Sequence, residues 1–284
     1  MKYRVLYELG KSRLCEASIS EYELDARLLL EFYCHTKRHD LIINPDLLVT
    51  KEQESAYLKA IEQRALRIPL QYITGQQDFM GLTFVVNEHV LIPRQDTEVL
   101  VETVLSYTRE GMQILDMCTG SGCILLSLLQ YTKACEGLGV DISSKALEVA
   151  KINHEKLIAF TGKDLKVTFM QSDLFQEITG SFDIIVSNPP YIRSEVIETL
   201  EPEVKLHEPV GALDGFLDGL YFYREIIKKS IAFLKPESML FFEIGHDQGD
   251  EVRALMRESG FLEVVVKKDL AGLDRVVFGK WKGI

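Results

Sequence analysis

The sequence predicts an α/β fold in which a seven-stranded, mostly parallel sheet follows a small N-terminal helical bundle and a β-hairpin linker. Apolar residues recur at helical spacing up to about residue 77, which is typical of an amphipathic bundle. From residue 113 onward, short apolar runs alternate with helical stretches, as in βαβ units. Only residues 268–274 separate the last two runs. Because that loop is too short for a crossover helix, we expect this pair to be antiparallel.

The chain divides by pattern into three parts. Residues 1–77 predict a helical domain, and residues 78–92, rich in β-branched and aromatic side chains, predict a hairpin that turns at Asn87-Glu88. Residues 93–284 predict the sheet domain, which opens with a helix capped by Asp96. We expect its strands, in chain order, at residues 113–117, 136–141, 166–171, 182–188, 238–244, 262–267 and 275–280.

Composition limits the classes of function. The chain has 284 residues, 46% of them hydrophobic, and a net charge of -11. Proteins that bind nucleic acid mainly through phosphates need clustered Lys and Arg, so this acidity argues against that class. The N-terminus has no signal-peptide pattern, and no apolar run approaches the ~20 residues of a membrane span. We therefore expect a cytoplasmic protein with no membrane partner and no stable nucleic-acid partner.

The cysteines are odd in number and form no Cys-x-x-Cys pair, so the sequence predicts neither a disulfide framework nor a zinc site. We expect reduced thiols and no bound metal. The five residues are Cys15, Cys34, Cys118, Cys123 and Cys135.

A glycine-containing loop follows the first predicted strand of the sheet and leads into an apolar helix. Gly120 and Gly122 let the backbone approach a ligand, and the helix N-terminus offers free N–H groups. Alone this signal is weak, because such turns are often only tight connections. Asp116 either meets the ligand or caps the loop. The loop residues that we expect to contact a cofactor are Asp116, Cys118, Thr119, Gly120, Ser121 and Gly122.

Acidic residues follow the next two predicted strands. Asp141 lies about 20 residues beyond the loop, the spacing at which a carboxylate accepts hydrogen bonds from a ribose. Asp173 follows the third strand, where it would bind an adenine amino group while Leu174 covers the ring. A helix N-cap followed by core residues is the alternative interpretation of this pair.

The fourth predicted strand runs directly into the tetrapeptide Asn188-Pro189-Pro190-Tyr191. Prolines end the strand, which leaves the Asn188 side chain and the Pro189 carbonyl at the edge where open α/β sheets bind ligands. These two acceptors can hold a planar NH2 group, orient its lone pair and stabilise charge that develops on nitrogen. Tyr191 would pack against the planar group. The tetrapeptide by itself does not distinguish adenine, cytosine and glutamine.

Together these features resemble the S-adenosylmethionine-dependent methyltransferases that act on planar nitrogens, over the last two thirds of the chain. The resemblance implies a Rossmann-like class I methyltransferase sheet, with S-adenosylmethionine as cofactor and S-adenosylhomocysteine as product. Cys118 departs from the pattern, since these loops commonly carry a glycine there, and we expect altered packing rather than lost binding. The implied cofactor contacts beyond the loop are Asp141, Asp173, Leu174 and Asn188.

Five further segments carry distinctive patterns: residues 67–75, 90–98, 208–214, 218–221 and 223–224. They resemble a narrower family, the peptide chain release factor glutamine methyltransferases (PrmC/HemK family), from about residue 60 to the end. This resemblance implies methylation of the glutamine amide in the Gly-Gly-Gln motif of class 1 release factors, which act in translation termination. It implies that Asn188, Pro189, Pro190 and Tyr191 hold the glutamine and that the helical domain recognises the substrate.

Three more residues are candidate substrate contacts. Arg94 and Glu98 lie between the hairpin and the glycine loop, where we expect them to shape the active-site wall. An ordinary surface ion pair between them is the alternative, since exposed pairs are common and weak. Glu243 ends the fifth predicted strand at the ligand edge, where it contacts substrate or only satisfies a loop.

Two other activities stay open. Glutamine methyltransferases of a ribosomal protein share the tetrapeptide but tend to lack the Ile-Pro-Arg-x-Asp-Thr-Glu form of residues 92–98. An adenine-N6 nucleic-acid methyltransferase would need a basic, aromatic-rich surface, which residues 1–77 do not indicate. A domain that binds the cofactor without turnover is disfavoured because the tetrapeptide and the glycine loop are intact. We expect class 1 release factors as the partner and a monomeric chain.

Overall fold

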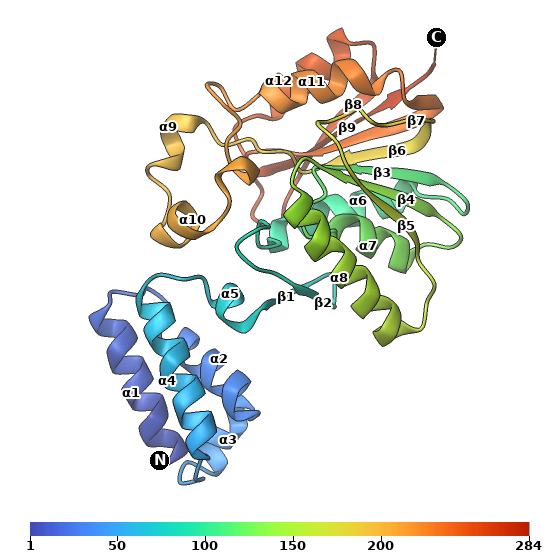
Figure 1. Cartoon of the computed structure of the whole chain (residues 1–284). Coiled ribbons are helices and arrows are strands. Elements are labelled where there is room, and N and C mark those ends of the chain that lie inside the picture. The colour runs from blue at the N-terminus through green and yellow to red at the C-terminus, as the bar shows by residue number, and fades with distance from the viewer. Residues whose placement is uncertain (284) are drawn as a thin grey trace. The chain divides into compact units, whose positions relative to one another are not determined.

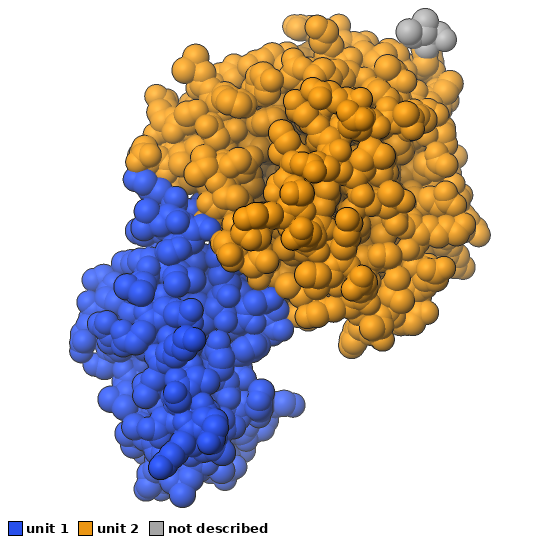
Figure 2. Space-filling view, in the orientation of Figure 1, with its two compact units in different colours: residues 1–76, 201–207 blue, residues 77–200, 208–284 orange. Residues whose placement is uncertain are grey.

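The computed structural model describes residues 1–283. They form two compact units, which Figure 2 colours separately. One unit holds residues 1–76 and 201–207, and the other holds residues 77–200 and 208–284. The N-terminal unit therefore includes a short segment that comes from within the sequence of the larger unit.

The N-terminal unit is a helical bundle, as its apolar periodicity predicts. Its core consists of residues at helical spacing, such as Leu6 and Leu14 of one helix and Leu29 of the next, which are fully buried. Thr50 caps the fourth helix in a capping box with Gln53, which satisfies two free N–H groups. The helices are α1 (Tyr3–Glu16), α2 (Tyr22–Cys34), α3 (Arg38–Ile43), α4 (Lys51–Ala65), α5 (Leu70–Thr74) and, from the later segment, α10 (Pro202–His207).

A buried ion-pair network attaches α10 to this bundle. The Arg64 guanidinium, whose side chain is 8% exposed, lies 2.7 Å from an oxygen of Asp25 and 2.9 Å from an oxygen of Glu203. Arg67 lies 3.3 Å from the same Glu203 oxygen. Since an unpaired buried charge is costly, each member of the network depends on the others.

The larger unit is built on a seven-stranded sheet with the order β5-β4-β3-β6-β7-β9-β8 (Figure 1). The first five strands in this order pair in parallel, and β9 pairs antiparallel with both β7 and β8, which confirms the predicted fold class. The fifth strand of the sheet begins at Leu234, earlier than predicted. The strands are β3 (Gln113–Met117), β4 (Glu136–Asp141), β5 (Lys166–Gln171), β6 (Phe182–Ser187), β7 (Leu234–Glu243), β8 (Leu262–Lys268) and β9 (Asp274–Trp281).

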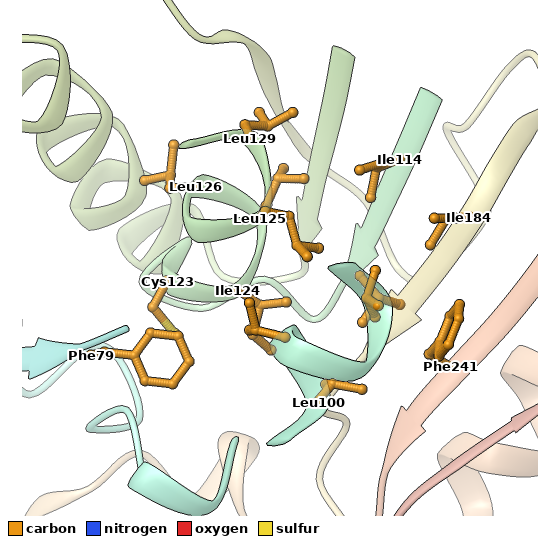
Figure 3. Packing of buried hydrophobic residues seen from close by; sticks show 14 of the residues in the cluster. Phe79, Leu100, Ile114, Cys123, Ile124, Leu125, Leu126, Leu129, Ile184 and Phe241 are labelled. Carbon is orange, nitrogen blue, oxygen red and sulfur yellow. The ribbon is translucent and has the colours of Figure 1, made fainter. Parts of the chain in front are cut away.

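Helices cover both faces of this sheet because successive strand residues point to opposite faces. Ile114, Ile184 and Phe241 belong to the core on the side of α6 and α7, which Figure 3 shows from close by. The neighbouring residues Leu115 and Ile185 belong to the core on the side of α11 and α12. The helices of this unit are η1 (Gln95–Thr97), α6 (Glu98–Tyr107), α7 (Cys123–Tyr131), α8 (Ser144–Thr161), α9 (Ser194–Ile197), η2 (Val210–Ala212), α11 (Tyr221–Ser230) and α12 (Gly249–Glu258).

The hairpin consists of β1 (Gln76–Phe79) and β2 (Leu82–Val85), and it turns at Met80-Gly81. The predicted turn at Asn87-Glu88 is wrong. Met80 and Gly81 both have positive φ, +51° and +70°, as a tight hairpin turn requires, whereas the Asn87 side chain only accepts a local hydrogen bond from a backbone N–H.

The hairpin is also more than a linker, because its apolar side chains are part of the larger unit's core. Phe79 and Phe84 pack edge to face, with ring centroids 6.2 Å apart, in the same cluster as residues of α6 and α7. Figure 3 shows Phe79 beside Cys123 of α7. The amide of Asn153 binds the backbone of Val85 from α8 and also donates to the carbonyl of Ser121 in the glycine loop. The hairpin is thereby attached to the loop that shapes the candidate site.

Within residues 1–283, every helix is either too short or too polar to cross a membrane.

We expect Arg64→Ala to lower the free energy of unfolding of the full chain by about 3 kcal/mol, because it leaves the buried Asp25 carboxylate without its partner and Glu203 with Arg67 alone. Arg13→Ala is the matched control, since Arg13 pairs with Glu62 at the exposed surface of the same bundle and should cost less than about 1 kcal/mol. Chemical denaturation measures both. Equal effects of the two variants would contradict the assignment of a buried network.

Candidate functional site

A cavity of about 360 Å³ opens in the larger unit, at the C-terminal ends of β3, β4, β5 and β6. The strand order reverses between β3 and β6, because the chain adds β4 and β5 on one side of β3 and β6 and β7 on the other. Open α/β sheets bind ligands at such a switch point. The volume lies in the range of small-molecule sites.

The glycine loop after β3 forms the floor of the cavity. The N–H of Gly120 donates to Asp141 Oδ2 at 2.9 Å, and the N–H of Thr119 donates to the carbonyl of Val140 at 2.9 Å. Gly120 has a φ of +54°, and nothing stands within 4 Å of the position of a Cβ, so the backbone is open to a ligand there. Gly122, by contrast, packs against Ala150 and does not line the cavity.

Asp116 caps the loop rather than lining the cavity. Its Oδ2 accepts a hydrogen bond from the Thr119 hydroxyl at 2.6 Å, and the residue is fully buried. Its Oδ1 is buried without a hydrogen-bond partner among the described residues. Burial raises the pKa of Asp116 to about 7, against the lowering effect of the Thr119 hydrogen bond.

Cys118 lines the cavity and has a φ of +63°, in the left-handed region that favours glycine. The departure from the glycine pattern therefore costs backbone strain at this position. Burial raises the pKa of the Cys118 thiol, so the group is a neutral, small wall residue rather than a nucleophile.

Asp141, Asp173 and Leu174 all line the cavity, in agreement with their predicted place at the ends of β4 and β5. The Asp141 carboxylate accepts N–H bonds from Gly120 and Ser143, both at 2.9 Å. A carboxylate has about four acceptor positions, so Asp141 keeps capacity for two hydroxyl donors. The cavity wall therefore offers a carboxylate that can accept hydrogen bonds from a pair of ligand hydroxyl groups.

Of the tetrapeptide, Asn188 and Pro190 line the cavity, whereas Pro189 and Tyr191 are not among the lining residues. The Asn188 Nδ2 donates to the Thr97 hydroxyl at 3.5 Å, a contact that uses none of the acceptor capacity of its Oδ1. The Tyr191 hydroxyl donates to Glu243 Oε1 at 3.4 Å. The expectation that Tyr191 packs on the substrate stays a prediction, and its hydroxyl has a partner within the protein.

The segment of residues 92–98 forms one wall, and its charged side chains pair with other loops. Arg94 lines the cavity and binds Glu208, which also accepts the N–H of Ile92 at 3.2 Å. Arg94 therefore does not pair with Glu98. Glu98 instead accepts the N–H of Met80 at 2.6 Å, in the hairpin turn, and does not line the cavity.

Asp96 is not the helix cap that the sequence predicts. The residue at the N-cap of α6 is Thr97, whose side chain makes no cap hydrogen bond, and Asp96 lies in the preceding turn η1. Its carboxylate lies 3.3 Å from Arg275 of β9, which also pairs with Asp269 at 3.1 Å. The Asp96 carboxylate therefore pairs with Arg275, on a strand distant in sequence, and does not cap α6.

Glu243 is buried behind the tetrapeptide, with 1% exposure, and does not line the cavity. Burial raises its pKa to about 7, while Thr97, Arg275 and Tyr191 lower it. Its Oε2 is a buried oxygen without a hydrogen-bond partner in residues 1–283. Glu243 therefore contacts the tetrapeptide through the Tyr191 hydroxyl without lining the cavity.

Several lining residues were not among the sequence candidates. Thr97 is buried and contacts Asn188, and Ile142 is apolar yet 67% exposed. Pro209, directly before η2, and Phe222 of α11 also line the cavity. Ile142 directly follows Asp141, the last residue of β4. Its place in the cavity could be predicted from the sequence only after the end of that strand had been located. Among the described residues, no group of His, Cys, Asp and Glu is arranged to hold a metal ion.

We expect Glu243→Gln to stabilise the protein more at pH 8 than at pH 5. A carboxyl whose folded-state pKa of about 7 exceeds its ordinary value of 4.5 binds more protons in the native state, so the free energy of unfolding falls as pH rises through this window. The neutral amide removes this loss, worth on the order of 2 kcal/mol. Denaturation at both pH values measures it, with exposed Glu102→Gln as control. A difference independent of pH would contradict the assignment.

The model of the PrmC N-terminal domain matches residues 6–75, and that of the methyltransferase small domain matches residues 94–201. A solved methyltransferase from Pyrococcus furiosus superposes with a TM-score of 0.52 at 17% identity, covering 72% of this chain and 90% of that one. This likeness shows the fold.

The curated relatives are named release factor glutamine methyltransferase. That of Caulobacter vibrioides is 43% identical over 273 residues, which cover 95% of this chain and 93% of the relative. That of Clostridium botulinum is 41% identical, over 94% of this chain and 95% of the relative. The two domain matches and these full-length similarities agree with the tetrapeptide at the end of β6. The chain belongs to the release factor glutamine methyltransferase family.

Proposed function

We propose that this protein transfers a methyl group from S-adenosylmethionine to the side-chain amide nitrogen of a glutamine in class 1 peptide chain release factors, in the Gly-Gly-Gln motif that the family resemblance implies. The observation that carries the proposal is the juxtaposition of two features on neighbouring parallel strands. The glycine loop after β3 and the tetrapeptide after β6 line one cavity, with Asn188 facing it.

An amide nitrogen is a poor nucleophile because its lone pair is conjugated with the carbonyl. In the proposed reaction the Asn188 Oδ1 and the Pro189 carbonyl each accept one N–H of the glutamine amide. This orients the nitrogen and stabilises the positive charge that develops on it. One N–H proton leaves to a carbonyl or water as the N–C bond forms, so no strong base is needed. The Thr97 contact supports this role, because it engages the Asn188 NH2 and leaves the oxygen to the cavity.

S-adenosylmethionine, when bound, would supply a methyl group on a sulfonium sulfur, whose C–S bond breaks as the amide nitrogen forms the N–C bond, with the neutral thioether as the leaving group. The residues present fit this cofactor. Asp141 retains acceptor capacity for the ribose, and Asp173 and Leu174 line the wall beyond it. Gly120 leaves open space beside the backbone, and the free oxygen of buried Asp116 lies under the same loop. The carboxylates also favour a cationic ligand.

The helical unit is the proposed docking domain for the release factor. Large apolar side chains of this unit are exposed, Ile42 at 75%, Ile43 at 68% and Leu48 at 73%. Exposed apolar side chains that lie close together in sequence are typical of surfaces that bind another protein. The Lys and Arg residues of positions 1–77 are matched by an equal number of Asp and Glu residues, whereas binding through phosphates needs a basic excess, which supports a protein substrate over a nucleic acid.

We expect label from methyl-labelled S-adenosylmethionine to appear on one glutamine of a purified class 1 release factor, and not on ribosomes or DNA offered in parallel. Mass spectrometry of the digested substrates maps the methyl group. Label on a ribosomal protein or on adenine would replace the proposal with one of the alternative activities, and no label on any substrate would overturn it.

The same assay tests the tetrapeptide. Asn188→Ala should lower the transfer rate by at least about 100-fold, because it removes an acceptor that is needed in the transition state, while cofactor affinity stays within a few-fold. Gln113→Ala is the control, since it removes a side-chain amide at the opposite end of β3, outside the cavity, and should retain most of the activity. Asn188→Ala with undiminished turnover would refute the role of Asn188.

We expect Asp141→Asn to weaken binding of S-adenosylmethionine and S-adenosylhomocysteine about 10-fold or more, because the amide loses charge and one acceptor position towards the ribose. Isothermal titration calorimetry measures both affinities. Asp183→Asn is the control. Its carboxylate likewise accepts a backbone N–H, from Gln113 at 2.8 Å, but at the opposite end of the sheet. Equal affinities of the two variants would contradict the assignment of Asp141.

A further inference from the structure

The amide of Gln248, in the connection between β7 and α12, is buried directly behind the tetrapeptide. The residue is 4% exposed. Its Nε2 donates to the carbonyl of Tyr191 at 3.0 Å and to the carbonyl of Gly219 at 3.2 Å. Its Oε1 accepts the N–H of Gly245 at 2.9 Å and the Tyr223 hydroxyl at 3.4 Å. Both ends of the side chain are therefore engaged, and the donors point at the backbone of two separate loops.

We propose that Gln248 is a positioning residue for methyl transfer, which fixes the backbone of the tetrapeptide against the loop of residues 213–220. The inference rests on the proposed function and extends it to a residue that touches neither cofactor nor substrate. Residues 213–220 are called the rim loop below.

The rim loop lies against the tetrapeptide at main-chain distance. Ile192 donates its N–H to the carbonyl of Leu213 at 2.9 Å, and Gly215 donates to the carbonyl of Ile192 at 2.8 Å. A Cβ on Gly215 would stand 2.7 Å from the Tyr191 Cα. Only glycine permits this approach, so the rim loop and the tetrapeptide behave as one layer.

Gly219 closes the same junction. Its φ is +74°, and a Cβ there would fall against the Tyr191 carbonyl oxygen and 2.7 Å from Gln248 Nε2. The carbonyls of Tyr191 and Gly219 both point at one NH2 group, and without a donor between them they would repel each other. The NH2 group of Gln248 therefore links the tetrapeptide to the rim loop by donating to both carbonyls.

Tyr191 is held at both ends, its hydroxyl by Glu243 and its carbonyl by Gln248. Two prolines precede it and restrict φ, so the position of its backbone sets that of Pro189 and Asn188. A displacement of about 1 Å in a positioned acceptor costs on the order of 100-fold in rate. Loss of the hydrogen bonds from Gln248 should therefore lower the rate of the chemical step more than the affinity for either ligand.

The test is Gln248→Met in the full chain, which keeps the length of the side chain and removes both donors. We expect kcat for release factor methylation to fall at least about 10-fold. KM for the release factor and the Kd of S-adenosylhomocysteine should stay within about 3-fold, a split that a general loss of folding would not produce. Tyr223→Phe is the control. It removes a hydroxyl that contacts Gln248 from the other side, away from the tetrapeptide, and should leave kcat near wild type.

A second pair of variants keeps the inference testable if Gln248→Met does not fold. Gly219→Ala and Gly162→Ala place the same methyl group at similar φ, +74° and +68°, but nothing lies within 4 Å of the Cβ at Gly162. Both should lower the melting temperature through backbone strain. Only Gly219→Ala should lower kcat at least about 10-fold, because only it displaces the Tyr191 carbonyl.

The outcomes separate the inference from the proposed function. If the wild type methylates a release factor but folded Gln248→Met or Gly219→Ala matches its kcat, the positioning role is overturned and the proposed function stands. If the wild type methylates no release factor, both are overturned. A fall in kcat with preserved affinities, absent from Tyr223→Phe and Gly162→Ala, supports the role.

Discussion

The parallel pairing of β3 with β6 is the constraint on which the site depends. It places residues some seventy positions apart side by side, and the Ser187 hydroxyl reinforces the pair by donating to the carbonyl of Met117 at 2.6 Å. Because parallel strands end at the same edge, the loop after β3 and the turn after β6 must meet there. Residues of the 92–98 wall line the cavity at that edge, and Asn153 joins the hairpin to the glycine loop there.

The walls of the cavity are organised by charge neutralisation as much as by shape. Arg94 pairs with Glu208, and Asp96 pairs with Arg275 of β9, so two charged residues of the wall have partners that come much later in the chain. A carboxylate as buried as Glu208, whose side chain is 1% exposed, is stable only with such a partner. The charged residues of this segment are therefore held by partners elsewhere in the larger unit.

Much of this architecture is predictable from sequence, for identifiable reasons. The sheet, its antiparallel end and the positions of Gly120, Asp141 and Asn188 follow from patterns local to each strand end. The hairpin turn was misplaced because Met80-Gly81 lacks the usual Asn-Gly or Asp-Gly signature. The partners of Asp96 and Glu98 could not be predicted, since Arg275 and the Met80 N–H reach them only through the tertiary fold. Thr97 and Gln248 were missed for the same reason.

The membership of residues 201–207 in the helical unit has a consequence for how the protein can be divided or recombined. A single cut near residue 77 does not separate two self-sufficient modules, because α10 would stay with the catalytic half while Arg64 and Arg67, its partners, would leave with the other. A chimera that exchanges recognition domains between relatives must therefore move two stretches of sequence together. Over evolutionary time, substitutions in the two stretches are expected to be correlated.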